Sequence, residues 1–388
     1  MDTQNTPIHV KLWHKEFWMM AFANLLLMTS IYMLVPALPP YLLHEGFTPL
    51  QVGALMGSYG IGVFLLGCFC SYLIQRYRRN HVCQYSIIGV AFCIAVLYYL
   101  DFVLNVKLEF WMILCTRIAL GALLGLAQMT LSSTLVIDTC ESFQRTEANH
   151  SAAWFARLAL AVGPLVSILT YHWFNYASVL IMACVMAVIS FLLITLVKFP
   201  FKAPSESMTL FSLDRFFLPQ GFPLFVNLTM ITTVIGLVLA MHHSGLFFEM
   251  MIVGFVLAML AEKYAFADAD LKSEIITGLI LLGAAELIFL SGQAKAIDYI
   301  CPTCIGFSTG IIGSRFLLFY LKLAKHCQRG TSQSSFFLSW ELGVSLGLFI
   351  GISQLVQNTT YLSLGLIMIS MLFYNFFVHP WYIKHKNR

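Results

Sequence analysis

The chain has 388 residues, of which 59% are hydrophobic and only 10% are charged, and its mean hydropathy is +0.82. Soluble domains carry roughly 25% charged residues, so the composition excludes a soluble globular protein and indicates one that lies in a lipid bilayer. The formal net charge of +4 is modest and reflects membrane topology, so we expect no nucleic-acid partner.

Apolar runs separated by charged or turn-forming residues predict twelve membrane-spanning helices, each near the roughly 20 residues that cross a bilayer. The first six are expected at 17–37, 51–74, 82–101, 108–136, 149–172 and 176–198. After a polar stretch with Pro200 and Pro204, the second six are expected at 222–242, 245–262, 274–293, 298–324, 334–357 and 360–382.

Two sets of six spans around one polar stretch predict an all-α membrane protein with two six-helix bundles. We expect the N-terminal bundle at 1–198, a cytoplasmic linker at 199–220 and the C-terminal bundle at 221–388. Lys11 and Lys15 precede the first apolar run, which is too long for a secretory signal, so we interpret it as an uncleaved first span.

Lysine and arginine fall mostly on one side of this topology, which the positive-inside rule assigns to the cytoplasm. The opposite side holds only Lys107 and Lys295, while Arg117, Arg157 and Arg315 fall inside spans. We therefore expect both termini in the cytoplasm. The predicted cytoplasmic residues are Lys11, Lys15, Arg76, Arg78, Arg79, Arg145, Lys198, Lys202, Arg215, Lys263, Lys272, Lys322, Lys325, Arg329, Lys384, Lys386 and Arg388.

The two halves contain a weak internal repeat. When the stretch from Gln144 is set against the stretch from Gln328 at a constant offset of 184, Arg157 falls on Glu341. Each stretch joins the fourth and fifth spans of its half, so the halves look like parallel copies of one six-helix unit. The identical pairs are Gln144 and Gln328, Arg145 and Arg329, Ser151 and Ser335, Leu158 and Leu342, and Gly163 and Gly347.

At this point the chain resembles the major facilitator superfamily, whose members place two pseudo-symmetric six-helix bundles around a central cavity. VPALPPYLLHEGFTPLQVGALMGSYGIGVFLLG looks like the family's first helix end, external loop and second helix. RIALGALLGLAQ, from Arg117, looks like its fourth-helix motif, AVGPLVS is similar to its fifth-helix Gly-Pro motif, and QRGTSQSSFFLSWELGVSLGLFIG looks like the start of its eleventh helix.

The loop between the second and third spans departs from the family pattern Gly-x-Leu-x-Asp-Arg-x-Gly-Arg-Arg. It reads SYLIQRYRRN, with Ser71, Gln75 and Arg78 at the first Gly, the Asp and the second Gly, while Arg76 and Arg79 remain. Losing the carboxylate at Gln75 removes a charge that helps to latch the cytoplasmic side in the family, and leaves at most an amide hydrogen bond. Whether this loop still gates transport is left open.

Charged residues inside spans are functional candidates because each costs about 2.5 to 3.5 kcal/mol on insertion scales. The resemblance places Arg117 against the cavity with a role in proton coupling; the alternative is a structural hydrogen bond to carbonyls of a neighbouring helix. Arg157 is a candidate for lining or gating the cavity; the alternative is a side chain that snorkels to the cytoplasmic interface.

Arg315 and Glu341 lie at similar depths on spans ten and eleven, so we expect them to pair, either as a structural pair or as a switch. Glu341 is our first candidate for the proton-coupling carboxylate, and Glu249 on span eight is the second, because a buried Glu can bind and release a proton. Glu286 is expected to be structural, since the ninth helix is peripheral in the family, and Asp138 is expected at the interface.

Cys301 and Cys304 open span ten on the outside, and His242 and His243 end span seven. Cys and His bind zinc, and Cys-x-x-Cys has suitable spacing. Adjacent histidines often cannot face one metal, however, and the intervening Pro302 fits a helix start. We therefore expect no metal site and no cofactor.

Gly163 and Pro164 are expected to kink span five and to allow close helix packing, since Pro164 donates no N–H to the helix and Gly163 has no side chain. An ordinary packing kink is the alternative. In the family this element often belongs to exporters that exchange protons for substrate.

No phosphate-binding loop of the form G-x-x-x-x-G-K-[ST] occurs, so we expect neither an enzyme nor a transporter driven by ATP within this chain. We expect a monomeric secondary transporter in a cell membrane, specifically a bacterial inner membrane, which exports a small amphipathic compound in exchange for protons. The alternatives are a proton-coupled uptake symporter for a metabolite and a non-transporting membrane sensor or scaffold on the same fold.

Overall fold

The computed structural model of the chain describes residues 11–104, 106–199, 209–266, 270–291, 294–325 and 328–386. The regular elements among these residues are all helical. In the first half they are α1 (Lys15–Tyr32), α2 (Leu34–His44), α3 (Pro49–Leu65), α4 (Gly67–Arg76), α5 (Arg79–Tyr98), η1 (Tyr99–Val103), α6 (Phe110–Thr130), η2 (Leu131–Leu135), α7 (Val136–Asp138), η3 (Ser142–Gln144), α8 (Arg145–Trp173) and α9 (Tyr176–Thr195).

The second half repeats this succession of long helices. Its elements are η4 (Pro219–Gly221), α10 (Phe222–Met241), α11 (Gly245–Tyr264), α12 (Leu271–Ser291), α13 (Ile297–Leu323), α14 (Arg329–Ser353), α15 (Thr359–Phe373), η6 (Tyr374–Val378) and α16 (His379–His385).

Among the described residues, 11 helices are long and apolar enough to cross a membrane, or 12 when α3 and α4, which meet at a bend of 46°, count as one span. These helices correspond to the twelve predicted spans. The first span is longer than predicted, since helix continues from α1 through α2 to His44 despite Pro39 and Pro40. The fold class predicted from the sequence is therefore confirmed.

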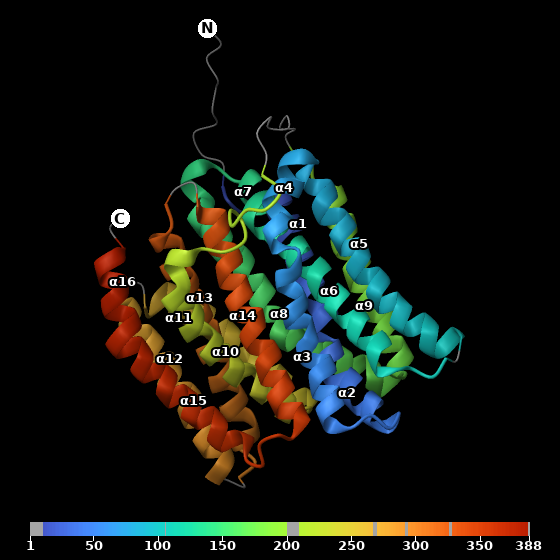
Figure 1. Cartoon of the computed structure of the whole chain (residues 1–388). Coiled ribbons are helices and arrows are strands. Elements are labelled where there is room, and N and C mark those ends of the chain that lie inside the picture. Colours follow the sequence, from blue (N-terminus) through green and yellow to red (C-terminus); the bar gives the residue numbers. More distant parts are fainter. Residues whose placement is uncertain are drawn as a thin grey trace.

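The helices of the first half, blue to green, stand beside those of the second half, yellow to red (Figure 1). We call the end that carries α4, α7 and α16 the basic end, because Arg76, Arg79, Arg215, Lys322 and Lys384 lie on its helix termini and connections. The other end, which carries α2 and the start of α15, is the opposite end. The division at 1–198, 199–220 and 221–388 stays a proposal, since residues 200–208 of the linker lie outside the described residues.

Several helices begin where a polar side chain accepts a hydrogen bond from an otherwise unpaired backbone N–H. Thr48 and Gln51 form a capping box at the start of α3. Asn175 caps α9 through Ser178, with a distance of 2.9 Å from its Oδ1 to the backbone nitrogen. Gly46, with φ of +91°, makes the turn between α2 and α3, a conformation that favours glycine.

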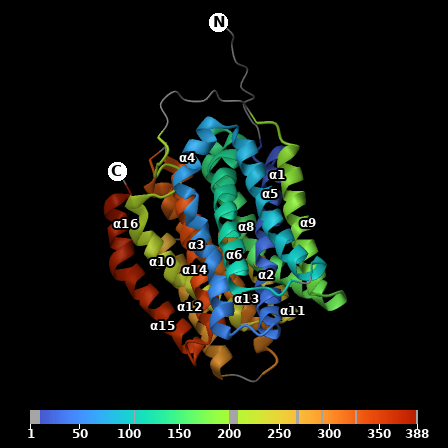
Figure 2. The same ribbon diagram turned by 45° about the vertical axis from the view of Figure 1, so that its right-hand side comes forward.

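Helix α3 lies between α6 of its own half and α14 of the other half (Figure 2). Glycines make both approaches possible. A Cβ atom on Gly121 of α6 would lie 2.1 Å from the carbonyl oxygen of Tyr59 on α3. A Cβ atom on Gly60 of α3 would lie 2.5 Å from Cβ of Ser345 on α14. Small residues allow such backbone contacts between helices in membranes, where lipid gives little hydrophobic drive for association.

We predict that Gly121→Ala destabilises the protein by about 1 to 3 kcal/mol, because the new methyl group meets the backbone of Tyr59, which cannot rotate away. The matched control is Gly365→Ala on α15, where an added Cβ has no neighbour within 4 Å. The measurement is the thermal unfolding midpoint in detergent. Equal midpoints for the two variants would contradict this account of the contact between α3 and α6.

Candidate functional site

The two halves meet around a small cavity of about 30 Å³ at the centre of their interface. Pockets that hold a small molecule measure roughly 300 to 1,000 Å³, so the halves are closed together here. The cavity is lined by Asn24, Met28, Tyr32, Gln128, Ser132, Ala153, Ala156 and Arg157 from the first half and by Gln333, Phe336, Phe337, Trp340 and Glu341 from the second.

Glu341 on α14 connects the two halves at this cavity. Glu341 is only 1% exposed. The hydroxyl of Tyr32 on α1 donates to Oε1 at 2.7 Å, and the hydroxyl of Tyr59 on α3 donates to Oε2 at 3.2 Å. Both carboxylate oxygens are thus satisfied by donors from the opposite half, and hydrogen bonds to an ionised acceptor are among the stronger ones in proteins.

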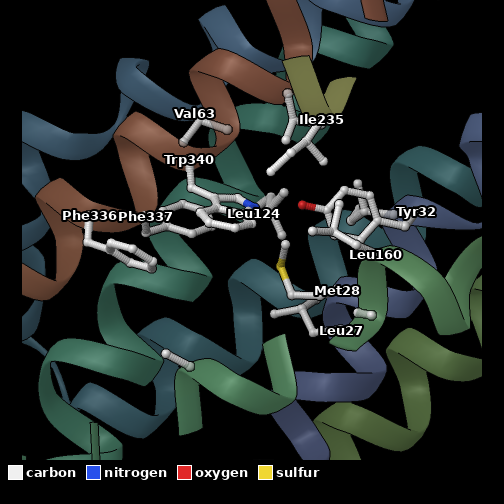
Figure 3. Packing of buried hydrophobic residues seen from close by; sticks show 14 of the residues in the cluster. Leu27, Met28, Tyr32, Val63, Leu124, Leu160, Ile235, Phe336, Phe337 and Trp340 are labelled. Carbon is white, nitrogen blue, oxygen red and sulfur yellow. The ribbon is translucent and has the colours of Figure 1, made fainter. Parts of the chain in front are cut away.

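Close helix packing brings the two tyrosines to this position. A Cβ atom on Gly163 of α8 would lie 2.7 Å from Cβ of Tyr32, so the glycine expected at a packing site in span five allows α8 to approach Tyr32. Pro164 lies inside α8, which is helical from Arg145 through Trp173. Figure 3 shows the hydroxyl of Tyr32 and the indole nitrogen of Trp340 pointing toward one another across the cluster.

Arg157 lines the same cavity as Glu341, so the structure brings the two members of the duplicated position together. The residue is 3% exposed, and Nε, Nη1 and Nη2 have no hydrogen-bond partner among the described residues. Its guanidinium carbon lies over the rings of Trp154, at 5.2 Å, and Phe336, at 5.8 Å. Arg157 therefore does not snorkel to the interface.

The expected pair of Arg315 and Glu341 is not formed. Nε of Arg315 on α13 lies 2.5 Å from Oε2 of Glu274 on α12 and 3.7 Å from Oε1 of Glu262 on α11. The depth predicted for Arg315 gave no information on which face of α13 it occupies. The side chain points toward neighbours in its own half, whereas Glu341 points into the cavity.

Glu262 also connects the two halves near the basic end. Nε1 of Trp154 on α8 donates to its Oε2 at 3.1 Å, and Nε2 of His150 lies 3.8 Å from the same oxygen. His150 also contacts the hydroxyl of Ser314 on α13. The sequence analysis did not identify His150, Glu262 and Glu274 as site residues. The two carboxylates could have been sought, because a buried Arg315 requires a carboxylate on a neighbouring helix.

Arg117 on α6 is 1% exposed. Its Nε donates to the carbonyl oxygen of Leu55 at 3.3 Å and its Nη2 to that of Met56 at 3.4 Å, while its guanidinium carbon lies 5.3 Å from the ring centre of Tyr59. This is the geometry of the structural alternative, hydrogen bonds to a neighbouring helix. A role in proton coupling stays a prediction, since Arg117 touches the tyrosine that bonds Glu341.

The two carboxylates of the outer part of the second half differ in burial. Glu249 on α11 is exposed, so the expectation that it is a buried proton carrier is wrong. The buried positions of α11 form a stripe at Phe247, Phe248, Met251 and further along the helix, and residue 249 lies outside that stripe. Glu286 on α12 is buried and accepts a hydrogen bond from the hydroxyl of Ser363 at 2.6 Å, which fits the structural role expected for it.

At the basic end, a carboxylate from the segment between the halves lies beside the degenerate loop. Nε2 of Gln75 donates to the hydroxyl of Ser71 at 2.9 Å, and Ser71 donates to Oδ2 of Asp214 at 3.5 Å. Oδ1 of Asp214 accepts from the hydroxyl of Thr331 on α14 at 3.0 Å. The carboxylate absent at Gln75 thus has a counterpart in Asp214, which joins α4 to α14.

Three arginines of this end are also engaged. Nη1 of Arg79 lies 2.7 Å from Oδ2 of Asp138, and Arg76 contacts the hydroxyl of Tyr72. Arg215 donates through Nη1 to the carbonyl oxygen of Ser133 at 3.5 Å. Burial and the nearby Arg79 guanidinium lower the pKa of Arg215. Arg79 and Asp138 thus join α5 to α7 within the first half, and Arg215 joins the segment between the halves to η2 of the first half.

The cysteine and histidine pairs do not converge. His242 stacks on Phe247, with ring centres 4.5 Å apart. Cys301 is buried and, like Cys304, carries a free thiol. In the part of the chain that the structure describes, no group of three or more His, Cys, Asp or Glu residues has a geometry that could hold a metal ion.

We predict that Arg157→Met raises the thermal unfolding midpoint of the protein without ligand. An unsatisfied buried donor costs about 1 to 3 kcal/mol, and methionine fills similar space without a charge. Arg117→Met is the matched comparison and should not raise the midpoint, because Arg117 donates to two carbonyl oxygens. A lower midpoint for Arg157→Met would show that its guanidinium is already compensated.

We predict that Glu274→Gln lowers the unfolding midpoint, because it leaves the Arg315 cation with only the more distant Glu262. Removing one partner of a buried pair costs about 3 to 5 kcal/mol. The double variant Glu274→Leu with Arg315→Met should recover most of this loss, since it removes both charges. If the double variant were as unstable as the single one, the pair would not be the cause.

The profile of the Major Facilitator Superfamily matches residues 20–348. No curated protein matches. The crystal structure of the human organic anion transporter MFSD10 (TETRAN) has a TM-score of 0.70 at 16% identity, over 93% of this chain and 99% of that one.

Two further solved structures have the same fold. The nucleoside transporter NupG has a TM-score of 0.65 at 11% identity, over 93% of this chain and 100% of that one. A bacterial homologue of the iron transporter ferroportin, in an outward-facing state, has a TM-score of 0.64 at 18% identity, over 97% of this chain and 100% of that one. At these identities the likeness shows the fold alone. The profile match spans most of the chain, and together with the two-bundle fold it shows that the chain belongs to the major facilitator superfamily of membrane transporters.

Proposed function

We propose that the chain is a proton-coupled secondary active transporter of a small amphipathic compound, and that Glu341 carries the coupled proton. The single observation that carries this proposal is the position of Glu341, which is buried between the halves and, among the described residues, accepts hydrogen bonds only from tyrosine hydroxyls of the opposite half. In alternating access, binding of the coupled ion shifts the equilibrium between two conformations of the transporter. We propose that protonation of Glu341 does this, because its hydrogen bonds join the two halves.

Protonation changes what Glu341 can do for the interface. An ionised carboxylate accepts from both Tyr32 and Tyr59, whereas a protonated carboxyl carries a donor and loses acceptor capacity. The charge-assisted part of both bonds is then lost. Binding a proton therefore weakens the contact between α14 and the first half, and releasing it strengthens that contact.

The substrate must enter when the halves separate, because the present cavity of about 30 Å³ holds no more than a water-sized molecule. The lining combines apolar side chains such as Met28, Phe337 and Trp340 with polar ones, which suits an amphipathic compound. The three similar transporters are named for an organic anion, a nucleoside and iron, so the fold alone does not select among substrate classes.

The coupled proton could move against the substrate, as in export by exchange, or with it, as in uptake by symport. The resemblance of the Gly163-Pro164 stretch to proton-exchanging exporters favours export, and an uptake symporter for a metabolite is the alternative. We place the protein in a cell membrane as a monomer with both termini in the cytoplasm, specifically in a bacterial inner membrane. A membrane sensor on the same fold would bind ligand without moving it.

We predict that Glu341→Gln abolishes proton movement driven by substrate, because glutamine keeps the size and acceptor of the side chain but cannot ionise. The measurement uses proteoliposomes with a pH-sensitive dye inside, challenged with amphipathic anions, cations and neutral compounds that stabilise the purified protein against heat. Alkalinisation or acidification of the interior on substrate addition gives the direction of coupling.

The matched control is Glu286→Gln, which changes another buried carboxylate that does not line the cavity and should leave coupled flux intact. Full coupled flux in Glu341→Gln would remove Glu341 as the proton carrier. Ligand binding with no flux in the wild type would favour the sensor and overturn transport.

A further inference from the structure

The guanidinium of Arg157 is a buried cation that forms no salt bridge with a carboxylate among the described residues, although Glu262 attracts it from a greater distance. The residue is 3% exposed, and all three nitrogens of its head group lack a hydrogen-bond acceptor in the described part of the chain. The other arginines in the middle of the spans are engaged, Arg117 by two carbonyl oxygens and Arg315 by two carboxylates. Buried charges in proteins are ordinarily paired, so Arg157 is the exception.

The immediate neighbours of Arg157 offset its charge only in part. The faces of Trp154 and Phe336 lie 5.2 Å and 5.8 Å from its guanidinium carbon, and a ring face attracts a cation. Neither ring offers a lone-pair acceptor for the N–H groups, however. Gly313 of α13 completes the enclosure, since a Cβ atom there would lie 2.6 Å from Cδ of Arg157. The head group is thus held in place while its donors stay unused.

The nearby carboxylates of the protein are already bound to other groups. Glu341 lines the same cavity but accepts from Tyr32 and Tyr59. Glu262 accepts from Trp154 and lies within 4 Å of Arg315. Glu341 would have to give up a tyrosine to pair with Arg157. Oε1 of Glu262 accepts no hydrogen bond from a described residue, but it lies 3.7 Å from Nε of Arg315.

We infer that Arg157 is the binding group for the negatively charged end of the transported compound, which is an amphipathic monoanion such as an aromatic carboxylate. This inference rests on the proposed transport function and names its substrate class. The guanidinium fork matches a carboxylate with two parallel hydrogen bonds. The apolar part of the compound lies against Met28, Phe337 and Trp340, which line the cavity around Arg157. Gln333, whose Oε1 is buried without a donor, is placed to bind a hydroxyl or amide of the same compound.

A fixed cation beside a protonatable carboxylate also sets the sign of coupling. With Arg157 charged, the cavity is neutral when Glu341 is ionised and the site is empty. It is neutral again when Glu341 is protonated and a monoanion is bound. The other two combinations leave a net charge in a low-dielectric interior, where uncompensated charge is costly. Arg157 and Glu341 are the charged residues that line this cavity. Arg117, which lies against Tyr59, and Glu262, which attracts Arg157 without a salt bridge to it, carry opposite charges that stay constant through the four combinations. On this inference the anion and the proton cross in the same direction, so it selects the cotransport alternative over the exchange that the resemblance of the Gly163-Pro164 stretch favours.

The test measures binding of three probes of one shape to the purified full chain by calorimetry: naphthalene-2-carboxylate, naphthalene-2-carboxamide and 2-naphthylmethylammonium. We expect the carboxylate to bind roughly tenfold or more tightly than the other two, the ratio expected when a charge-assisted pair is present. Arg157→Gln should abolish this preference, and Arg157→Lys should keep part of it because it keeps the charge without the fork. Lys322→Gln, which removes an exposed basic residue at the basic end, should bind as the wild type.

Equal binding of the carboxylate and the carboxamide by the wild type, or an unchanged preference in Arg157→Gln, would overturn the inference. The unfolding midpoint of each variant without probe shows whether the variant is folded. If Arg157→Gln does not fold, Arg157→Lys takes its place, and a reduced preference for the carboxylate in that variant supports the inference. A carboxylate that binds through Arg157 but is not carried into proteoliposomes would overturn the transport function and leave the anion site standing. Flux of neutral compounds that is unaffected by Arg157→Gln would overturn the anion site and leave the transport function standing.

Discussion

The structure depends on how a carboxylate is kept inside a bilayer. Glu341 is almost fully buried between membrane-spanning helices, where a carboxylate is costly unless its oxygens find hydrogen-bond donors. The donors are Tyr32 and Tyr59 of the opposite half, and they reach it only because the helices that carry them pack closely. Gly163 allows α8 to press against Tyr32, and Gly60 allows α3 to meet α14 beside Tyr59. The close packing between the halves is thus the condition for burying the charge.

The two members of the duplicated position have different surroundings. Arg157 and Glu341 occupy equivalent places in the repeat and line one cavity, but they are not treated alike. The carboxylate is fully hydrogen-bonded, while the guanidinium has only ring faces around it. An asymmetric pair of this kind leaves the empty site neutral overall with one set of donors unused. The proposed anion site follows from that imbalance rather than from the fold.

Much of the fold could be predicted because hydrocarbon imposes length and apolarity on each span, and the repeat placed Arg157 and Glu341 at one level. The faces of the helices could not be predicted. In a soluble helix the polar side marks the surface, but in a membrane the lipid-facing side is as apolar as the buried side. Glu249 was therefore expected inside and is exposed. For the same reason Arg315 was matched with Glu341 by depth, although it faces Glu274 on a neighbouring helix. The contacts of Asp214 with Ser71 and Thr331 could not be predicted, because they depend on the path of the chain between the two halves.

The contacts between the halves differ between the basic end, the middle and the opposite end of the molecule. Opening at one end would therefore break different contacts from opening at the other. At the basic end, Trp154 bonds Glu262, and Asp214 joins Ser71 to Thr331. At the opposite end, a Cβ atom on Gly53 of α3 would lie 2.7 Å from the carbonyl oxygen of Phe349 on α14, so the helices touch without charged groups. The bonds of Glu341 lie between these two sets. In the proposed transport cycle, separation at either end would tilt α14 relative to α1 and α3 and so strain the same two tyrosine contacts. If Glu341 carries the proton as we propose, its protonation weakens the central contact for both openings, and the two outer sets of contacts decide which side opens.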